Sequence, residues 1–299
     1  MAILRHHFSR MLRPVLLSLL MSLFAFSPGA AWGGQGAATH GSLELISEQQ
    51  SIEPGREFSI GLRFHLEKGW HIYWVNPGDS GEPPKVNWEL PAGFRAGDLQ
   101  WPAPQRLDHP PLTDFGYEGE VLLLAQVHPP ARFAGGGGNA TLAADVKWLV
   151  CRDICGPAHQ RVTLSLPIKT GAPKGDPNWR LLFERTRARL PRPAPPNWKS
   201  TVLAEGKDFV LSIDWGASQT GSNQTGASKT PATFFPLEPL QIENAAPQRA
   251  SAVPGGIRLT LEKSDQLLKP IANLKGVIVL GNGRAYLIDA PVIQNKRRT

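Results

Sequence analysis

Short segments in which apolar residues alternate with polar or small ones recur along most of this 299-residue chain. Residues 58–66 (FSIGLRFHL) show the pattern most clearly, because every second side chain is a large apolar one. A period of two places such side chains on a single face of a β-strand. Turn-forming residues separate the segments, and the chain holds 28 prolines and 30 glycines, which favours many turns. The sequence therefore predicts strands as the main structural element.

Similar short strands are expected on both sides of residue 190. In the N-terminal half they are expected at residues 70–75, 86–90, 121–127, 142–150 and 162–166. In the C-terminal half they are expected at residues 201–203, 209–215, 256–261, 275–280 and 284–288. Many short strands without alternating helices favour antiparallel sandwiches over a βαβ fold. We therefore expect an all-β chain with two immunoglobulin-like β-sandwich domains.

One helical segment interrupts the β pattern. Asp176 followed by Pro177 is typical of a helix start. Apolar residues then follow at helical spacing: Trp179, Leu182, Phe183 and Leu190. Residues 191–196 (PRPAPP) predict a stiff linker after the helix. This places the domain boundary there, with a first sandwich at residues 40–170, the helix and linker at residues 171–198, and a second sandwich at residues 199–293.

The first 32 residues have the composition of a secretory signal peptide. Three arginines and no acidic residue precede an apolar run at residues 15–26, and small residues follow that run. The run is shorter than the ~20 residues that a membrane-spanning helix needs. We therefore expect residues 1–32 to be cleaved, and the mature chain to lie outside the cytoplasm without spanning the membrane.

The formal net charge of +7 lies mostly at the two ends of the chain. Arg5, Arg10 and Arg13 fall in the expected signal peptide, and residues 296–298 (KRR) supply three more positive charges. The body of the chain is close to neutral and lacks the basic stripe that nucleic-acid-binding domains carry. A nucleic-acid partner is therefore not expected. The sequence also lacks the G-x-S-x-G and H-E-x-x-H motifs of hydrolases.

Cys151 and Cys155 are the only cysteines, and they lie within residues 148–157 (WLVCRDICGP). In an oxidising compartment, two cysteines and no others favour a mutual disulfide. A continuous strand would separate their Cα atoms by ~13 Å, whereas a disulfide needs about 4.4–6.8 Å. The chain must therefore turn within residues 152–154, and Cys155, in the loop, is expected to be the more exposed cysteine.

The residues alone leave three interpretations of this pair open. As a structural staple, a ring of about five residues would contribute roughly 2 kcal/mol, less than a longer loop would. As a redox pair, a tight ring would be readily reduced, and Arg152 could favour the thiolate, partly opposed by Asp153. As a metal site, His159 could join Cys151 and Cys155 in a copper-binding or copper-tolerance protein. If the disulfide is only structural, the protein is expected to be a non-enzymatic exported binding module.

Five motifs occur in an order that resembles a known family. They are residues 69–81 (GWHIYWVNPGDSG), 88–94 (WELPAGF), 100–104 (QWPAP), 115–121 (FGYEGEV) and 148–155 (WLVCRDIC). Together they resemble the periplasmic N-terminal domain of the thiol:disulfide interchange protein DsbD over about residues 40–168. The resemblance is strongest to the ScsB-type branch (suppressor of copper sensitivity). Residues 276–292, which contain GRAYLIDAP, resemble the second β domain of that branch.

The resemblance implies an immunoglobulin-like sandwich in the periplasm, with Cys151 and Cys155 as a redox disulfide and with no cofactor. It implies a relay of electrons between a membrane electron donor and periplasmic thioredoxin-like proteins. Because the family's transmembrane and thioredoxin-like domains have no match here, either that donor is a separate protein, which we expect, or the protein works without that relay. The family's aromatic cap loop corresponds to residues 114–118, so Phe115 or Tyr117 is expected to shield the cysteines.

Overall fold

The computed structural model describes residues 40–133, 138–216 and 232–294. Within these ranges the chain is almost entirely β-structure with a single helix, and its sheets pack as sandwiches. The expected all-β, immunoglobulin-like fold is therefore confirmed. No helix among the described residues is long and apolar enough to cross a membrane. The expected signal peptide lies outside the described residues.

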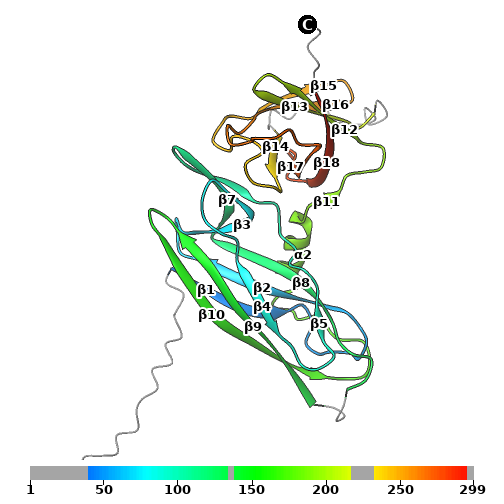
Figure 1. Ribbon diagram of the computed structural model, residues 1–299. Helices are drawn as coiled ribbons and strands as arrows, with labels where there is room; N and C mark the ends of the chain where they lie inside the picture. Colours follow the sequence, from blue (N-terminus) through cyan, green and yellow to red (C-terminus); the bar gives the residue numbers. More distant parts are fainter. Residues whose placement is uncertain (1–39, 134–137, 217–231, 295–299) are drawn as a thin grey trace, which may run out of the picture. The chain divides into compact units, whose positions relative to one another are not determined.

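The N-terminal half contributes ten strands to two sheets. Their bounds are β1 Gly41–Ser47, β2 Phe58–Leu66, β3 His71–Gly78, β4 Lys85–Glu89, β5 Arg95–Ala96, β6 Gln105–His109, β7 Leu112–Glu118, β8 Glu120–His128, β9 Gly138–Cys151 and β10 Cys155–Ile168. One sheet has the order β1-β2-β8-β5. The other has the order β10-β9-β3-β7-β6, with β4 also paired to β9 (Figure 1).

The core of this sandwich follows from the alternation in the sequence. The strand expected at residues 58–66 is β2, and its Ile60, Leu62 and Phe64 are completely buried. They share one core cluster with Leu142 and Val146 of β9, in the other sheet. The sandwich therefore forms because each sheet turns an apolar face toward the other, which removes both faces from water.

The helix α2 (Arg180–Arg189) begins three residues later than expected, because its N-cap is Trp179 and not Asp176. Asp176 lies in the preceding turn, where its carboxylate accepts a 2.9 Å hydrogen bond from the Asn178 backbone N–H. The expected apolar side of the helix is confirmed, because Phe183 is buried in a small cluster with Ile46, Leu122 and Leu124. The helix thereby packs beside β8 (Figure 1).

The C-terminal half forms a second sheet system. Its strands are β11 Arg192–Pro193, β12 Lys199–Glu205, β13 Asp208–Asp214, β14 Thr233–Pro236, β15 Arg249–Val253, β16 Gly256–Glu262, β17 Asn273–Val279 and β18 Ala285–Gln294. The order is β14-β17-β18-β12-β13-β16-β15, with β11 also on β18. The proline-rich segment expected as a linker thus supplies β11, in which Arg192 pairs with Tyr286.

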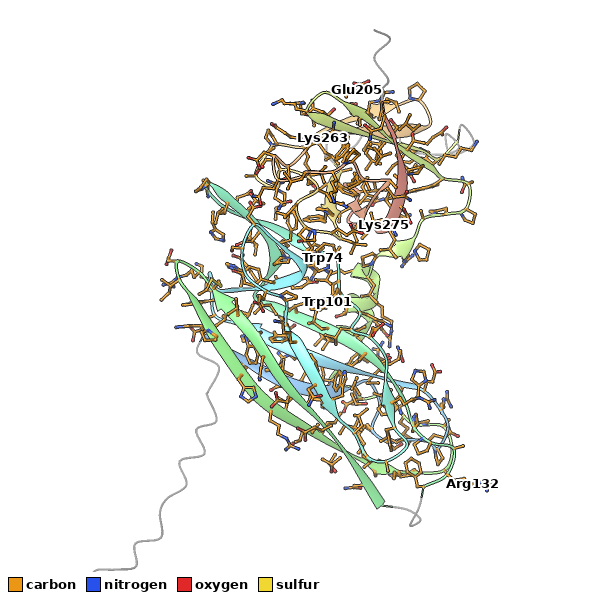
Figure 2. All side chains as sticks on the ribbon, viewed as in Figure 1. Trp74, Trp101, Arg132, Glu205, Lys263 and Lys275 are labelled. Carbon is orange, nitrogen blue, oxygen red and sulfur yellow. A yellow bond between two sulfur atoms is a disulfide. The ribbon has the colours of Figure 1, made fainter. Side chains whose placement is uncertain are left out.

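Contacts join the C-terminal half to β3 and β7 of the first sandwich. The ring of Phe235 lies edge-on to Trp74 at 6.2 Å and to Phe115 at 5.2 Å. Trp74, labelled in Figure 2, is only 1% exposed. The Asn76 amide donates a 2.8 Å hydrogen bond to the Pro236 carbonyl. Residues 35–299 group by their contacts into one compact unit, so the division into two domains stays a prediction.

Candidate redox site

The two cysteines close the tip of the β9–β10 hairpin. Cys151 and Cys155 are the last paired residues of the antiparallel register, and residues 152–154 form the turn between them. The backbone N–H of Arg152 donates a 3.1 Å hydrogen bond to the Ile154 carbonyl across this turn. The cysteines form a disulfide with a Cα–Cα distance of 4.2 Å. The expected turn within residues 152–154 is confirmed.

The two sulfur-bearing residues differ sharply in exposure. Cys151 is 1% exposed, whereas Cys155 is exposed at the end of the turn. Beside it, Ile154 is 75% exposed. The expectation that Cys155 is the more exposed cysteine is confirmed. A nucleophile or partner protein arriving from solvent therefore meets Cys155 before Cys151.

Tyr73 of β3 is the aromatic residue that contacts the disulfide. Its hydroxyl oxygen lies 3.5 Å from the Cys155 sulfur and 3.5 Å from the Ser80 hydroxyl. Burial raises the pKa of Tyr73, so the hydroxyl is neutral near pH 7 and can donate a hydrogen bond. Gly81 makes room for the ring, because a Cβ at this position would lie 2.1 Å from the Tyr73 Cζ atom.

A buried carboxyl group lies behind Tyr73. Both the backbone N–H and the hydroxyl of Ser80 donate hydrogen bonds of 2.9 Å to the carboxyl oxygens of Asp114. Burial raises the pKa of Asp114, which is only 4% exposed. Polar contacts thus run from the Cys155 sulfur through Tyr73 and Ser80 to Asp114.

The neighbouring Asp79 is held by residues from both halves of the chain. Its carboxylate accepts a 2.7 Å hydrogen bond from the Thr113 backbone N–H. The amide of Asn244, between β14 and β15, donates a second hydrogen bond of 2.8 Å to it. The segment that carries Ser80 and Gly81 is therefore fixed by the C-terminal half as well as by β7.

Phe115 and Tyr117 do not form a cap over the disulfide, so that expectation is wrong. Both lie in β7, where they are 0% and 1% exposed. The Tyr117 hydroxyl donates a 2.6 Å hydrogen bond to the Pro102 carbonyl, and Phe115 packs against Phe235. The reason is the strand period of two, which turns these two residues to the same core-facing side of β7. Sequence spacing could not reveal Tyr73, which is 82 residues from Cys155.

Arg152 extends from the turn toward other partners. Its guanidinium lies over the Trp70 ring at 5.1 Å from the centroid, and its Nε donates a 3.0 Å hydrogen bond to Asp153. The Trp70 ring also stacks on His40 at 3.6 Å. These contacts fix the base of the turn. The expected influence of Arg152 on a cysteine thiolate stays a prediction.

The metal site considered for Cys151, Cys155 and His159 is not assembled. His159 lies four residues beyond Cys155 on β10, about 13 Å along an extended strand. Its Nε2 is within 2.7 Å of the Asp145 carboxylate. In the part of the chain that the structure describes, no three His, Cys, Asp or Glu side chains gather as metal ligands.

His71 is a buried neighbour of the disulfide that the sequence did not indicate. It is the register partner of Cys151 on β3 and is 1% exposed. Its ring lies 5.3 Å from that of His109 and 5.2 Å from that of Tyr73. Burial and, secondarily, His109 lower the pKa of His71 to about 4, so its ring is neutral near pH 7.

The chain is similar to one family model and to several solved structures, of which the family model and the ScsB domain agree with this architecture. The family model described as the N-terminal part of thiol:disulfide interchange protein DsbD matches residues 43–167. The N-terminal periplasmic domain of ScsB from Proteus mirabilis superposes with a TM-score of 0.57 at 15% identity, covering 86% of this chain and 95% of that one. The periplasmic chaperone SfaE matches with a TM-score of only 0.22 at 10% identity, covering 85% of this chain and 100% of that one.

No curated protein sequence matches the chain at a significant level. The family match covers all of β2 to β9 together with the hairpin tip that carries the disulfide. A disulfide at that position fits thiol–disulfide exchange in general. The chain therefore contains a DsbD N-terminal-like domain, as the order of its motifs predicted.

Proposed function

We propose that this protein is a periplasmic thiol–disulfide oxidoreductase that relays electrons through Cys151 and Cys155. Its partners are a separate membrane electron donor and thioredoxin-like proteins. One observation carries the proposal: in a DsbD N-terminal-like domain, one cysteine of the disulfide is exposed at a hairpin tip and the other is buried. This arrangement gives an incoming thiolate one accessible target and a defined leaving group.

The reduction of the pair proceeds by two displacements. A thiolate of a reduced partner attacks the Cys155 sulfur, a mixed disulfide forms, and the electron pair of the broken S–S bond moves to the Cys151 sulfur. A second thiolate of the partner then attacks its own first sulfur and releases Cys155. The partner leaves as a disulfide, and the protein holds two thiols after taking up two protons. Oxidation of the protein follows the same steps in reverse.

The surroundings of Cys155 suit its role as the sulfur that bonds to the partner. The neutral Tyr73 hydroxyl, 3.5 Å from this sulfur, can donate a hydrogen bond to a Cys155 thiolate. The Ser80 hydroxyl lies next to the Tyr73 hydroxyl and itself donates a hydrogen bond to Asp114. The exposed Ile154 side chain offers a small apolar contact to a docking protein.

Trapping of a mixed disulfide tests the proposal. The variant Cys151→Ala leaves Cys155 as the only thiol, and Cys155→Ala leaves Cys151. As a probe we suggest a thioredoxin that lacks its resolving cysteine and carries a nitrothiobenzoate leaving group. The Cys155-only protein should form the mixed disulfide at least tenfold faster than the Cys151-only protein. Equal rates, or no adduct with either variant, would contradict the proposed exchange through Cys155.

A further inference from the structure

The imidazole of His71 is unusually placed for a buried histidine. In the described structure neither of its ring nitrogens has a hydrogen-bond partner, although the residue is 1% exposed. Buried polar atoms are ordinarily hydrogen-bonded. Two unpaired ring nitrogens therefore indicate that a polar group contacts them in another state of the protein. The neutral ring offers one N–H donor and one acceptor nitrogen.

The β-sheet register shows which atom can become that partner. His71 and Cys151 lie directly opposite each other in the antiparallel pairing of β3 and β9. Directly opposite residues point to the same face of the sheet, with Cβ atoms about 4.5–5.5 Å apart. A sulfur in a disulfide is a weak hydrogen-bond acceptor and no donor, whereas a thiol donates and a thiolate accepts strongly. Opening the disulfide therefore creates a hydrogen-bonding group opposite His71.

We propose that His71 is the hydrogen-bonding partner of the Cys151 sulfur whenever the disulfide is open, and that it stabilises the Cys151 thiolate as that thiolate leaves. The inference rests on the proposed exchange reaction and adds a residue to it. When the partner thiolate bonds to Cys155, the electron pair goes to Cys151, which is buried and out of reach of water. The His71 N–H then donates to that sulfur in place of water.

When the protein is oxidised, the same two residues form a hydrogen bond in the opposite direction. The Cys151 thiol donates its hydrogen bond to the acceptor nitrogen of His71, which aligns the sulfur for attack on the mixed disulfide at Cys155. His109 and Tyr73 flank the imidazole, and Glu118 is its register partner on β7. Glu118 is exposed, so Cys151 is the buried one of the two register partners of His71.

The test measures the Cys151 thiol and the redox equilibrium in full-length variants. In the Cys155→Ser background, thiolate absorbance at 240 nm gives the pKa of Cys151 with His71 present and with His71→Phe. Loss of the imidazole should raise that pKa by about one unit, a tenfold loss of thiolate. In the two-cysteine protein, His71→Phe should make reduction by glutathione about tenfold less favourable, which corresponds to about 30 mV.

Two further variants keep the test decisive. His71→Gln retains a donor and an acceptor and should recover at least a third of both effects, which a purely structural role would not explain. His109→Phe keeps the ring stacked on His71 and should change the Cys151 pKa by less than 0.3 unit. A folded His71→Phe or His71→Gln protein with an unchanged Cys151 pKa and an unchanged redox equilibrium would overturn the inference. Because each effect is measured relative to the parent protein, this result does not depend on whether the parent's absolute potential supports exchange.

Discussion

Acidification should destabilise the oxidised protein through His71. The ordinary pKa of a histidine is 6.5, and burial together with His109 lowers that of His71 to about 4. Between these two values the unfolded chain binds a proton that the folded protein does not, so the free energy of unfolding falls as the pH falls. The loss begins near pH 6.5 and levels off below pH 4. Between pH 7.5 and 4.5 it amounts to about 2.5 kcal/mol, at 1.36 kcal/mol for each pKa unit.

Acidification also protonates carboxyl groups, so the comparison needs matched variants. Asp114 opposes His71, because a carboxyl whose folded pKa is raised stabilises the fold as the pH falls through that pKa. His71→Phe removes only the histidine contribution and keeps an aromatic ring beside His109 and Tyr73. His65→Gln, an exposed histidine on β2, is the control and should behave like the parent protein.

Urea unfolding at pH 7.5, 6.5, 5.5 and 4.5, followed by tryptophan fluorescence, measures the effect. The parent and His65→Gln proteins should each lose about 2.5 kcal/mol more than His71→Phe over this range. A His71→Phe protein that loses as much stability as the parent, within about 0.5 kcal/mol, would refute the assignment of a buried neutral imidazole at this position.

Three further predictions concern the surroundings of the disulfide. Gly81→Ala should lower the free energy of unfolding by at least 2 kcal/mol, on the order of the combined costs of a positive φ and a clash with Tyr73. Gly119 also has a positive φ but faces open space, so Gly119→Ala should cost only about 1 kcal/mol in the same urea unfolding. Asn244→Ala should cost about 1.5–3 kcal/mol through the lost hydrogen bond to Asp79, and a loss below about 0.5 kcal/mol would argue against that contact. Tyr73→Phe in the Cys151→Ala background should raise the pKa of Cys155 by about half a unit, measured by alkylation rate against pH, and an unchanged pKa would remove the hydroxyl from the mechanism.

The sequence predicted the elements whose pattern is local. Strand β2 follows from the strict alternation of residues 58–66, and the turn at residues 152–154 follows from the reach of a disulfide. The disulfide between Cys151 and Cys155 was likewise predicted, because they are the only two cysteines of the chain and lie in one short motif. The start of α2 was misplaced because Asp176 and Pro177 form a turn before the helix, and turn and helix starts share the same residue preferences.

The rest of the site depends on contacts between distant segments. Tyr73 and His71 reach the disulfide because β3 pairs with β9 across some 80 residues of chain, which no local spacing encodes. The segment at residues 114–118 contains two glycine-flanked aromatics that favour a loop, yet pairing with both β3 and β6 makes it strand β7. Tertiary pairing therefore overrode the local signal and moved Phe115 and Tyr117 into the core.

The reduction potential of the Cys151–Cys155 pair tests the central claim most directly. Equilibration of the full-length protein with glutathione redox buffers, followed by alkylation of the free thiols, gives the potential. Exchange between partner proteins requires a value in the range of known exchange proteins, about −120 to −270 mV. A value well below about −300 mV would identify a structural bridge and contradict the proposed relay.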